Sequence, residues 1–337
     1  MSTAKDVAER AGTSTATVSY VLNNGPRPVS KGARERVLKA AQELNYHPHA
    51  AARALTVGKT HSYGLIIPSI QNPFFGELSH AIEMAAKEVG HLLLIADSAM
   101  DPEQERQQID AFVGRRVDGV VLISCAPKQD LDLVLANGIP VVALHPIIGN
   151  DRVQTVHMDY RRAAADLTEH LLVEHKVSSL LILTAKSEEG GSRDHKLGIG
   201  DAVDKFSPKT EIRHIQSEVS RADAYTATLD FLGANSKPEA VYCATDEQAY
   251  GVLSALHSLG IKVPEDIKVV GFDGTKHSRY SIPALTTVRQ PLQEIAETAI
   301  GVFFNENSKY QHATLLGELV IRESCGCQWD KTSEREP

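Results

Sequence analysis

The side chains most suited to chemistry stand near the N-terminus, where small polar groups recur at helical spacing. Within residues 15–20, the 3.6-residue period turns one set of side chains away from the apolar stripe. That outward set is Thr15, Ala16, Thr17, Ser19 and Tyr20. Hydroxyl groups can bond phosphate oxygens or base edges, and the methyl groups of Thr15 and Ala16 can contact a thymine methyl. The set therefore indicates recognition of DNA; the alternative is a plain helical hairpin with solvated hydroxyl groups.

Two short helices must position these side chains. Thr3 and Asp6 form a capping-box pair that starts the first helix, and Gly12 supplies the left-handed residue that ends it. Ser14 is placed to cap the second helix. The inward stripes of the two helices are Val7, Ala8, Ala11, Val18, Val21 and Leu22. Residues 4–22 therefore predict a helix-turn-helix, and DNA is the first partner to consider.

A third amphipathic segment, residues 30–46, completes a small domain. The residues expected to close its core over the first two helices are Val37, Leu38, Ala41 and Leu44. Gly32 stands in the first turn, so we expect the start of this helix to fray. The Ala-rich run that follows has almost no apolar face, so we expect disorder there until something packs against it. The sequence thus predicts a DNA-binding domain over residues 1–46 and a hinge helix or linker over residues 47–60.

Charge is distributed unevenly along the 337 residues. The net charge is −8, but residues 1–60 hold nine Lys or Arg against four Asp or Glu and so carry +5. The remaining 277 residues carry −13, so the positive charge is confined to the part that would meet phosphate. No apolar run reaches membrane-spanning length and no signal peptide precedes the helix-turn-helix. We therefore expect a cytoplasmic protein without membrane contact.

Beyond residue 60, near-continuous apolar strands alternate with helices, the pattern of parallel, doubly wound sheets. In a first lobe we expect strands over 63–68, 91–96, 118–124 and 139–144, with helices over 76–89, 102–116 and 128–137. In a second lobe we expect strands over 179–184, 211–215, 239–244 and 267–272, with helices near 161–175, 194–206, 221–233 and 246–259. The predicted fold is an all-α helix-turn-helix head plus an α/β sensor of two doubly wound parallel-sheet lobes. A ligand would lie between the lobes, at the carboxyl ends of the strands.

Six segments carry a family resemblance: DVAERAGTSTATVSYVLN (6–23), AAARAL (50–55), GLIIPSIQNPFFGEL (64–78), RRVDGVVL (115–122), VVGFDG (269–274) and PALTTVRQP (283–291). In this order they resemble the LacI family of bacterial transcription regulators, the group that contains the lactose and purine repressors. The resemblance runs over nearly the whole chain. It implies a homodimer whose sensor, residues 61–330, is like a periplasmic binding protein, with a disordered tail over 331–337. It also implies a last helix over 291–304 and three chain crossings, near 158–162, 285–290 and 320–324.

For the DNA-binding domain, the resemblance places Thr15, Ala16 and Tyr20 at base edges in the major groove. Tyr20 departs from the Arg or His more often found there, so guanine recognition at that position is in doubt. We interpret a second set as phosphate contacts that fix the register: Thr17, Ser19, Asn23, Arg27 and Tyr46. In the hinge, Leu55 is implied to be a wedge into the minor groove, beside Ala52 and Arg53.

For the sensor, the resemblance implies an effector site with several departures from the family. Its expected members are Asn72, Phe74, Phe75, His145, Tyr160, His195, Asp246, Asp273 and Gln290. His195 stands where an Arg is usual in the family. It comes three residues before Gly198, which we take to open the helix expected near 194–206. A neutral imidazole has one donor and one acceptor, so capture of an anionic ligand there is disfavoured. If His195 contacts the ligand, we expect affinity to depend on pH near its ordinary pKa of about 6.5.

Catalysis and metal binding have little support in the sequence. The serines without a G-x-S-x-G context include Ser187, Ser192 and Ser254. Five histidines could meet in space, but we expect them to be exposed or satisfied in the core: His145, His157, His170, His175 and His195. Cys125 and Cys243 are expected to be buried, whereas Cys325 and Cys327 are read as tail, with a redox switch conceivable. We expect no enzyme, no cofactor and no metal.

We interpret the chain as a homodimeric repressor that binds a palindromic operator and responds to a small-molecule effector in the cleft. The effector would be a sugar, a sugar derivative or a nucleoside. The alternative is a solute-binding protein of the periplasmic type without a gene-regulatory role. The helix-turn-helix, its positive charge and the missing signal peptide count against that alternative, and a doubly wound enzyme is a weaker third.

Overall fold

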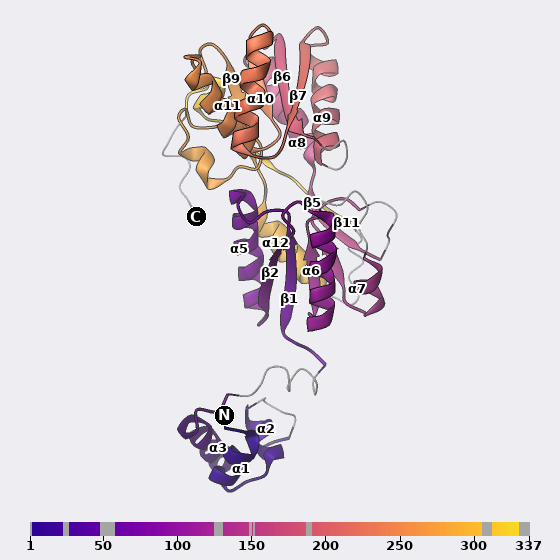
Figure 1. Cartoon of the computed structure of the whole chain (residues 1–337), viewed down its shortest axis with the longest axis vertical. Helices are drawn as coiled ribbons and strands as arrows, with labels where there is room; N and C mark the ends of the chain where they lie inside the picture. Colours follow the sequence, from indigo (N-terminus) through magenta and orange to yellow (C-terminus); the bar gives the residue numbers. More distant parts are fainter. Residues whose placement is uncertain are drawn as a thin grey trace. The chain divides into compact units, whose positions relative to one another are not determined.

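The structure is a computed structural model that describes residues 2–22, 27–47, 58–124, 131–147, 150, 152–186, 191–304 and 312–329 (Figure 1). Contacts divide the chain into two compact units. One comprises Met1–His61 with Arg116–Asp118, and the other comprises Ser62–Arg115 with Gly119–Pro337. Among the described residues, no helix is long and apolar enough to cross a membrane.

The N-terminal unit contains three helices, α1 (Ala4–Ala11), α2 (Thr15–Leu22) and α3 (Lys31–Glu43). Thr3 and Asp6 form the predicted capping box, and Gly12 ends α1 in the left-handed region with φ 61°. The core side chains of this unit are Val7, Ala8, Ala11, Val18, Val21, Val37, Ala40 and Ala41. The prediction for Leu38 was wrong: 48% of it is exposed, because α3 turns Ala40 inward at the next position of the stripe.

Two local features bracket the linker. Ser30 caps α3 by accepting a hydrogen bond from the amide of Ala33 at 3.4 Å, so the first turn that contains Gly32 is helical. At the far end, the amides of Thr60 and His61 donate to the two carboxylate oxygens of Asp118, at 3.0 and 2.7 Å. Residues 48–57, which include the predicted hinge helix, lie outside the described residues.

A six-stranded parallel sheet forms the first lobe of the second unit (Figure 1). Its order is β11-β5-β4-β3-β1-β2. The strands are β1 (Ser62–Ile67), β2 (Leu92–Asp97), β3 (Gly119–Leu122), β4 (Val141–Ala143), β5 (Gln154–Met158) and β11 (His312–Leu315). Helices α5 (Pro73–Glu88) and α12 (Leu292–Val302) pack on each other and on one face, while α6 (Pro102–Arg115) contacts β1 and α7 (Asp132–Ala136).

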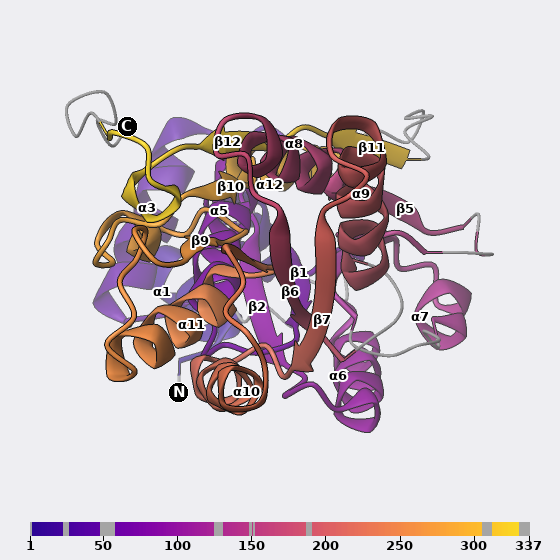
Figure 2. The ribbon, with the colours of Figure 1, turned by 90° about the horizontal axis from the view of Figure 1, so that it is seen from above.

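A four-stranded parallel sheet, β7-β6-β8-β9, forms the second lobe. Its strands are β6 (Ser179–Ala185), β7 (Glu211–Ser217), β8 (Ala240–Cys243) and β9 (Lys268–Val270). The helix pairs are α8 (Tyr160–Val173) with α9 (Gly191–Phe206), and α10 (Arg221–Ala234) with α11 (Asp246–Ser258). Each pair buries a separate apolar cluster against the sheet, and Figure 2 shows the pairs on its opposite sides. Both lobes are therefore doubly wound, as predicted.

Short strands at the chain crossings were not predicted. β5 and β11 extend the first sheet, and β10 (Thr287–Arg289) pairs antiparallel with β12 (Glu318–Val320) in a sheet of their own. The chain leaves the first sheet at Leu315 and joins β10 from Glu318, slightly before the crossing expected near 320–324. The 3₁₀ helix η1 (Lys276–Arg279) lies between β9 and β10, and the 3₁₀ helix η2 (Glu323–Cys325) follows β12.

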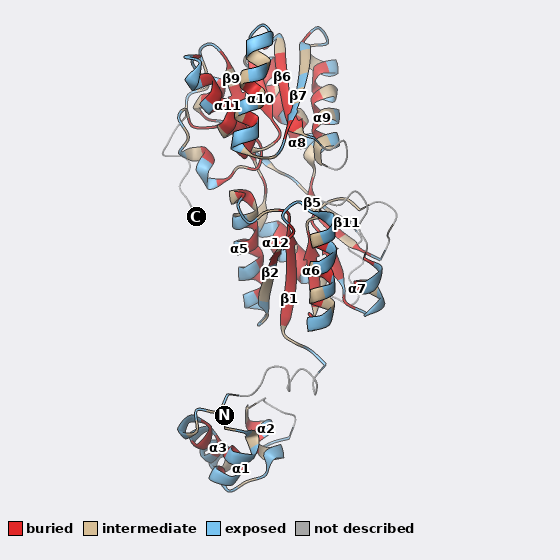
Figure 3. Ribbon diagram, in the orientation of Figure 1, coloured by how far each residue is buried: buried red, intermediate tan, exposed pale blue. Residues whose placement is uncertain are grey.

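Three other expectations need correction. β2 is an edge strand, so Leu92 is 64% exposed although its run reads as buried. In Figure 3 the neighbouring strand β1 is coloured as buried. Helix α9 begins at Gly191, so Gly198 lies inside it and does not open it; its missing side chain lets α8 approach closely. Cys325 is not part of a loose tail, because it is fully buried in the apolar cluster under α8 and α9. The predicted burial of Cys243 is confirmed.

Candidate DNA-binding surface and effector site

The outward face of α2 carries the side chains predicted to meet DNA. Thr15, Ala16 and Ser19 are exposed, while Thr17 and Tyr20 are half-buried. Ser14 precedes the helix and accepts a hydrogen bond from the amide of Thr17 at 3.2 Å, so the first turn is held with this face toward solvent.

The remaining predicted DNA contacts are only partly described. Arg27 is exposed, and Tyr46 is half-buried against the core of the three helices. The other predicted contacts, Asn23, Ala52, Arg53 and Leu55, lie outside the described residues. The described residues therefore include the face of α2 that is predicted to contact DNA, but not the predicted hinge.

A chain of hydrogen bonds joins three predicted effector residues that come from separate segments. Gln290, just after β10, donates from Nε2 to Oδ1 of Asp273 at 2.9 Å. The hydroxyl of Tyr160, at the start of α8, donates to Oε1 of the same Gln290 at 3.2 Å. Asp273 follows β9 with a φ of 111°, a conformation that costs a non-glycine residue energy. These hydrogen bonds thus hold the carboxyl group of the buried, strained Asp273 in a fixed orientation.

His195 joins this group from α9. Its ring lies 5.9 Å from that of Tyr160, packs edge-on against Phe272 at 4.3 Å, and its Nδ1 is 2.7 Å from the hydroxyl of Tyr242. Burial lowers the pKa of His195 to about 3, so the imidazole is neutral at physiological pH. The expected pH dependence near 6.5 therefore does not follow from this residue.

Phe272 and Tyr242 were missed by sequence reasoning. Both are fully buried aromatic residues at the ends of strands that read simply as apolar. The only available signal was their position: each lies beside a predicted strand end, where ligands of doubly wound sheets bind.

Two buried carboxyl groups differ in what they can offer a ligand. Burial, and then the nearby Asp246, raise the pKa of Asp273 well above its ordinary value. Burial also raises the pKa of Asp246 to about 7. The oxygens of Asp246 already accept from the amide and hydroxyl of Thr275 and from the hydroxyl of Thr287, at 2.6–2.9 Å. Asp246 therefore stabilises the loop that carries Asp273. Asp273 accepts fewer of these hydrogen bonds, so its carboxyl group can still bond a ligand.

The first lobe supplies the other predicted residues. Asn72 caps α5, its Oδ1 accepting from the amide of Phe74 at 2.9 Å. Phe74 lies in the core of the first sheet and Phe75 is half-buried beside it. Both ring nitrogens of His145 are buried. Burial, and then the charge of His157, lower the pKa of His145 to about 4.

The contacts link four of the nine predicted effector residues directly: Tyr160, His195, Asp273 and Gln290. No described contact joins them to Asn72, Phe75 or His145. The two lobes do touch nearby, where the amide of Lys276 in η1 donates to Glu77 of α5 at 2.9 Å.

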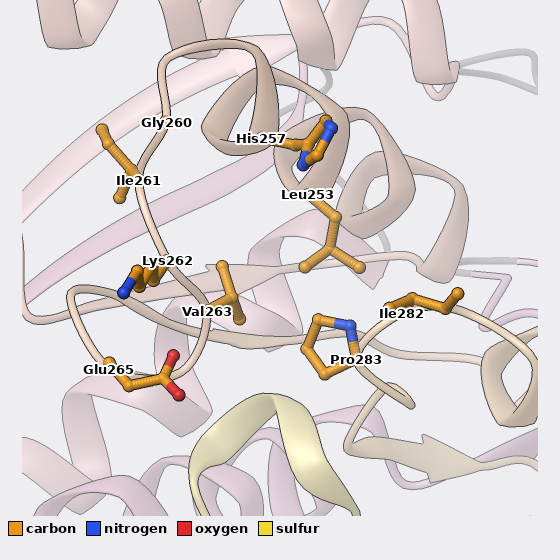
Figure 4. Close-up of a pocket in the computed structure, with 9 residues that line it drawn as sticks. All are labelled: Leu253, His257, Gly260, Ile261, Lys262, Val263, Glu265, Ile282 and Pro283. Atoms are coloured by element: carbon orange, nitrogen blue, oxygen red, sulfur yellow. The ribbon is translucent and has the colours of Figure 1, made fainter.

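A separate pocket of about 350 Å³ lies on the second lobe (Figure 4). The end of α11, residues 260–263 and the exposed Ile282 line it, and none of the predicted effector residues does. It is therefore not the site that the strand-end argument predicts.

Comparisons with known proteins agree with this architecture. Residues 3–49 match the family model of bacterial regulatory proteins of the lacI family, and residues 60–306 match that of periplasmic binding proteins and the sugar binding domain of the LacI family. The chain is 31% identical to the HTH-type transcriptional repressor PurR of Pasteurella multocida, covering 96% of this chain and 98% of the relative. It is 32% identical to the ribose operon repressor of Halalkalibacterium halodurans, covering 96% and 97%.

A solved structure of the lac repressor dimer bound to operator and the anti-inducer ONPF has the same fold, with a TM-score of 0.84, 24% identity and coverage of 96% of this chain and 99% of that one. The helix-turn-helix match does not favour a solute-binding protein without a regulatory role. These matches, over both the three-helix unit and the two-lobed unit, show that the chain belongs to the LacI family of bacterial transcription regulators.

Proposed function

We propose that this protein is a transcriptional repressor that binds an inverted-repeat operator as a homodimer and is controlled by a small molecule held between its two lobes. The observation that carries the proposal is the exposed polar face of α2 on a three-helix unit whose part of the chain, residues 1–60, carries +5. The domains divide the work: residues 1–46 read DNA, 47–60 form the hinge, and 61–330 sense the effector and dimerise. Such a protein acts in the cytoplasm and needs no catalytic group.

On the DNA, Thr15, Ala16 and Tyr20 contact base edges. The exposed Arg27 makes a phosphate contact, as do Thr17, Ser19, Asn23 and Tyr46. In the hinge, Leu55 with Ala52 and Arg53 enters the minor groove at the centre of the operator, at a flexible pyrimidine–purine step for which we propose CpG.

Dimerisation is supported by apolar side chains that the described monomer leaves in solvent. Along the edge strand β2, Leu92 is 64% and Ile95 44% exposed, and α5 exposes Met84 beside them. A monomer gains nothing from this apolar edge, whereas a second copy would cover it. The lac repressor neighbour with the same fold is itself a dimer.

The effector that suits the site is neutral and rich in hydroxyl groups, such as a sugar or a nucleoside. Asp273 and Gln290 can exchange their mutual hydrogen bond for bonds to ligand hydroxyls. The half-buried ring of Tyr160 offers a flat apolar surface, with the buried Phe272 stacked behind it. His195 is neutral and occupies the position where an Arg is usual. The site therefore lacks at this position a guanidinium that could bind a carboxylate or phosphate with two hydrogen bonds. Asn72, Phe75 and His145 would close on the ligand from the first lobe.

Selection of DNA fragments by the full-length protein tests the proposal, and we expect an inverted repeat to be enriched. On that operator, Arg27→Ala should weaken specific and random DNA alike and reduce the salt slope by about 1, whereas Lys209→Ala, an equal charge change on the second lobe, should do neither. Leu55→Ala should weaken the operator but barely change random DNA. No enriched sequence, or a monomer in sedimentation at micromolar concentration, would overturn it.

A melting-temperature screen with sugars, sugar phosphates and nucleosides then identifies the effector. Asp273→Asn should abolish the shift and keep operator binding, because the reading head is a separate unit. An unchanged ligand affinity in that variant would remove Asp273 from the site.

A further inference from the structure

Two histidines and two cysteines converge at the end of α8, outside both sites described above. His170 lies in the last turn of α8 and His175 two residues beyond its end; Cys325 ends η2, with Cys327 two residues further. Their donor atoms, two ring nitrogens and two sulfurs, all lie within 4.8 Å of one another. Both cysteines are free thiols. Segments about 150 residues apart thus meet at one point.

Four of the six distances between these atoms match the edges of a metal tetrahedron. Zinc bonds of about 2.05 Å to nitrogen and 2.3 Å to sulfur require a nitrogen–nitrogen edge of about 3.3 Å and nitrogen–sulfur edges of about 3.5 Å. The two Nε2 atoms of His170 and His175 are 3.2 Å apart. Nε2 of His170 lies 3.5 Å from Sγ of Cys325 and 3.6 Å from Sγ of Cys327, which is 3.4 Å from Nε2 of His175. Four edges therefore already have the required lengths.

The donor set also selects the ion. Two thiolates with two imidazoles and no carboxylate favour zinc over magnesium or calcium, which prefer oxygen. Four protein ligands close the coordination shell and leave no position for a substrate, the arrangement of structural zinc sites. The His-x₄-His spacing is within the range that such sites use.

The backbone and the neighbours support the same geometry. Gly326 has a φ of 100°, a conformation that favours glycine and that lets the two flanking cysteines face the same point. Cys325 is fully buried and His170 is 8% exposed, so an ion would be shielded from water on that side. The hydroxyl of Thr286 lies 3.1 Å from Sγ of Cys325, where it can donate to a thiolate as the outer partners of metal ligands do.

We propose that His170, His175, Cys325 and Cys327 bind one Zn²⁺ that fastens the C-terminal segment to helix α8 of the second lobe. This proposal departs from the sequence expectation of no metal, and it is independent of the proposed regulatory function. The segment concerned follows β12, the last crossing between the lobes. Arg322 and Ser324 already hold its first part by buried hydrogen bonds to Ser278, Leu285, Thr286 and Val269. A single ion would extend this attachment to Cys327 through four coordinate bonds.

Metal analysis of the full-length protein, purified without chelator, tests the site. We expect about one zinc per chain in the wild type and in His257→Gln, a control that removes an exposed imidazole of α11, but loss of zinc in Cys327→Ser and in His175→Gln. A chelator should lower the melting temperature of the wild type and of the control and leave both ligand variants unchanged.

A second measurement needs no variant. Co²⁺ added to metal-free wild type should give the visible bands of tetrahedral cobalt and a thiolate charge-transfer band, both displaced by Zn²⁺. Protein that neither retains zinc nor takes up Co²⁺ with these bands would overturn the proposal. So would zinc retained by the double variant Cys325→Ser, Cys327→Ser, or a Cys325–Cys327 disulfide in freshly purified protein.

Discussion

Substituting Gly198 tests how the second lobe is assembled, because one added carbon atom meets a fixed backbone. A Cβ at Gly198, inside α9, would lie 2.1 Å from the carbonyl oxygen of Arg161 in α8 and 3.0 Å from Cβ of Ala164. At Gly200, two residues along the same helix, a Cβ would meet nothing within 4 Å. Alanine favours a helix over glycine by about 1 kcal/mol. Gly200→Ala should therefore stabilise the lobe by up to about 1 kcal/mol.

Gly198→Ala gains the same helix propensity but must push α8 and α9 apart. Overpacking of this kind costs about 1–3 kcal/mol, and a clash with backbone cannot be relieved by a change of rotamer, so we expect net destabilisation. Denaturant unfolding followed by circular dichroism measures both variants; because the chain has several domains, midpoints of the same transition are compared. Gly251→Ala repeats the test in the second helix pair, with a Cβ 2.3 Å from the carbonyl oxygen of Arg221. Equal shifts for Gly198→Ala and Gly200→Ala would refute the close contact.

Three further predictions concern side chains whose surroundings differ from expectation. Burial holds the pKa of His195 at about 3 in the fold against 6.5 when unfolded, so the unfolded chain takes up a proton first as the pH falls. The free energy of unfolding of the wild type should therefore drop by up to about 2 kcal/mol between pH 6.5 and 5. His195→Gln should make the free energy of unfolding depend less on pH in this range, and an equal slope in both proteins would contradict the prediction. Leu92→Lys on the exposed edge of β2 should shift sedimentation toward monomer while leaving the melting temperature of the monomer unchanged; an undiminished dimer would place the interface elsewhere. Leu38→Gln on the outer face of α3 should change stability by less than about 0.5 kcal/mol, whereas Val37→Ala, in the core, should cost more.

The sequence predicted those elements whose signal is local. Capping at Thr3, the stop at Gly12 and the apolar runs of the sheets depend on residues a few positions apart, and the structure has them where they were expected. The four short crossing strands were missed, because runs of three to five residues acquire strand character only from a partner far along the chain. The exposure of Leu92 was missed for the same reason, since an edge strand and a central strand can have the same sequence.

The sequence placed several members of this hydrogen-bonded group in one predicted site, but it did not predict their chemistry. The resemblance supplied Tyr160, Asp273 and Gln290, and the structure joins them by hydrogen bonds. The burial that makes His195 neutral depends on Phe272 and Tyr242, which lie far from it in sequence. The same holds for the metal ligands: His170 and His175 gave no pair on one helical face, and only the fold brings them to Cys325.

If the effector binds the hydrogen-bonded group as we propose, the position of this group gives the small molecule a way to act on the whole sensor. Tyr160 follows the first crossing between the lobes, and Gln290 lies at the second, immediately after β10. A change in the angle between the lobes must be absorbed in these crossing segments, because the sheets on either side are packed and stiff. A ligand that takes over the bond between Gln290 and Asp273 therefore acts on a crossing segment itself. Ligand contacts confined to one lobe would raise affinity without favouring either angle, since only a difference in affinity between two states shifts their populations.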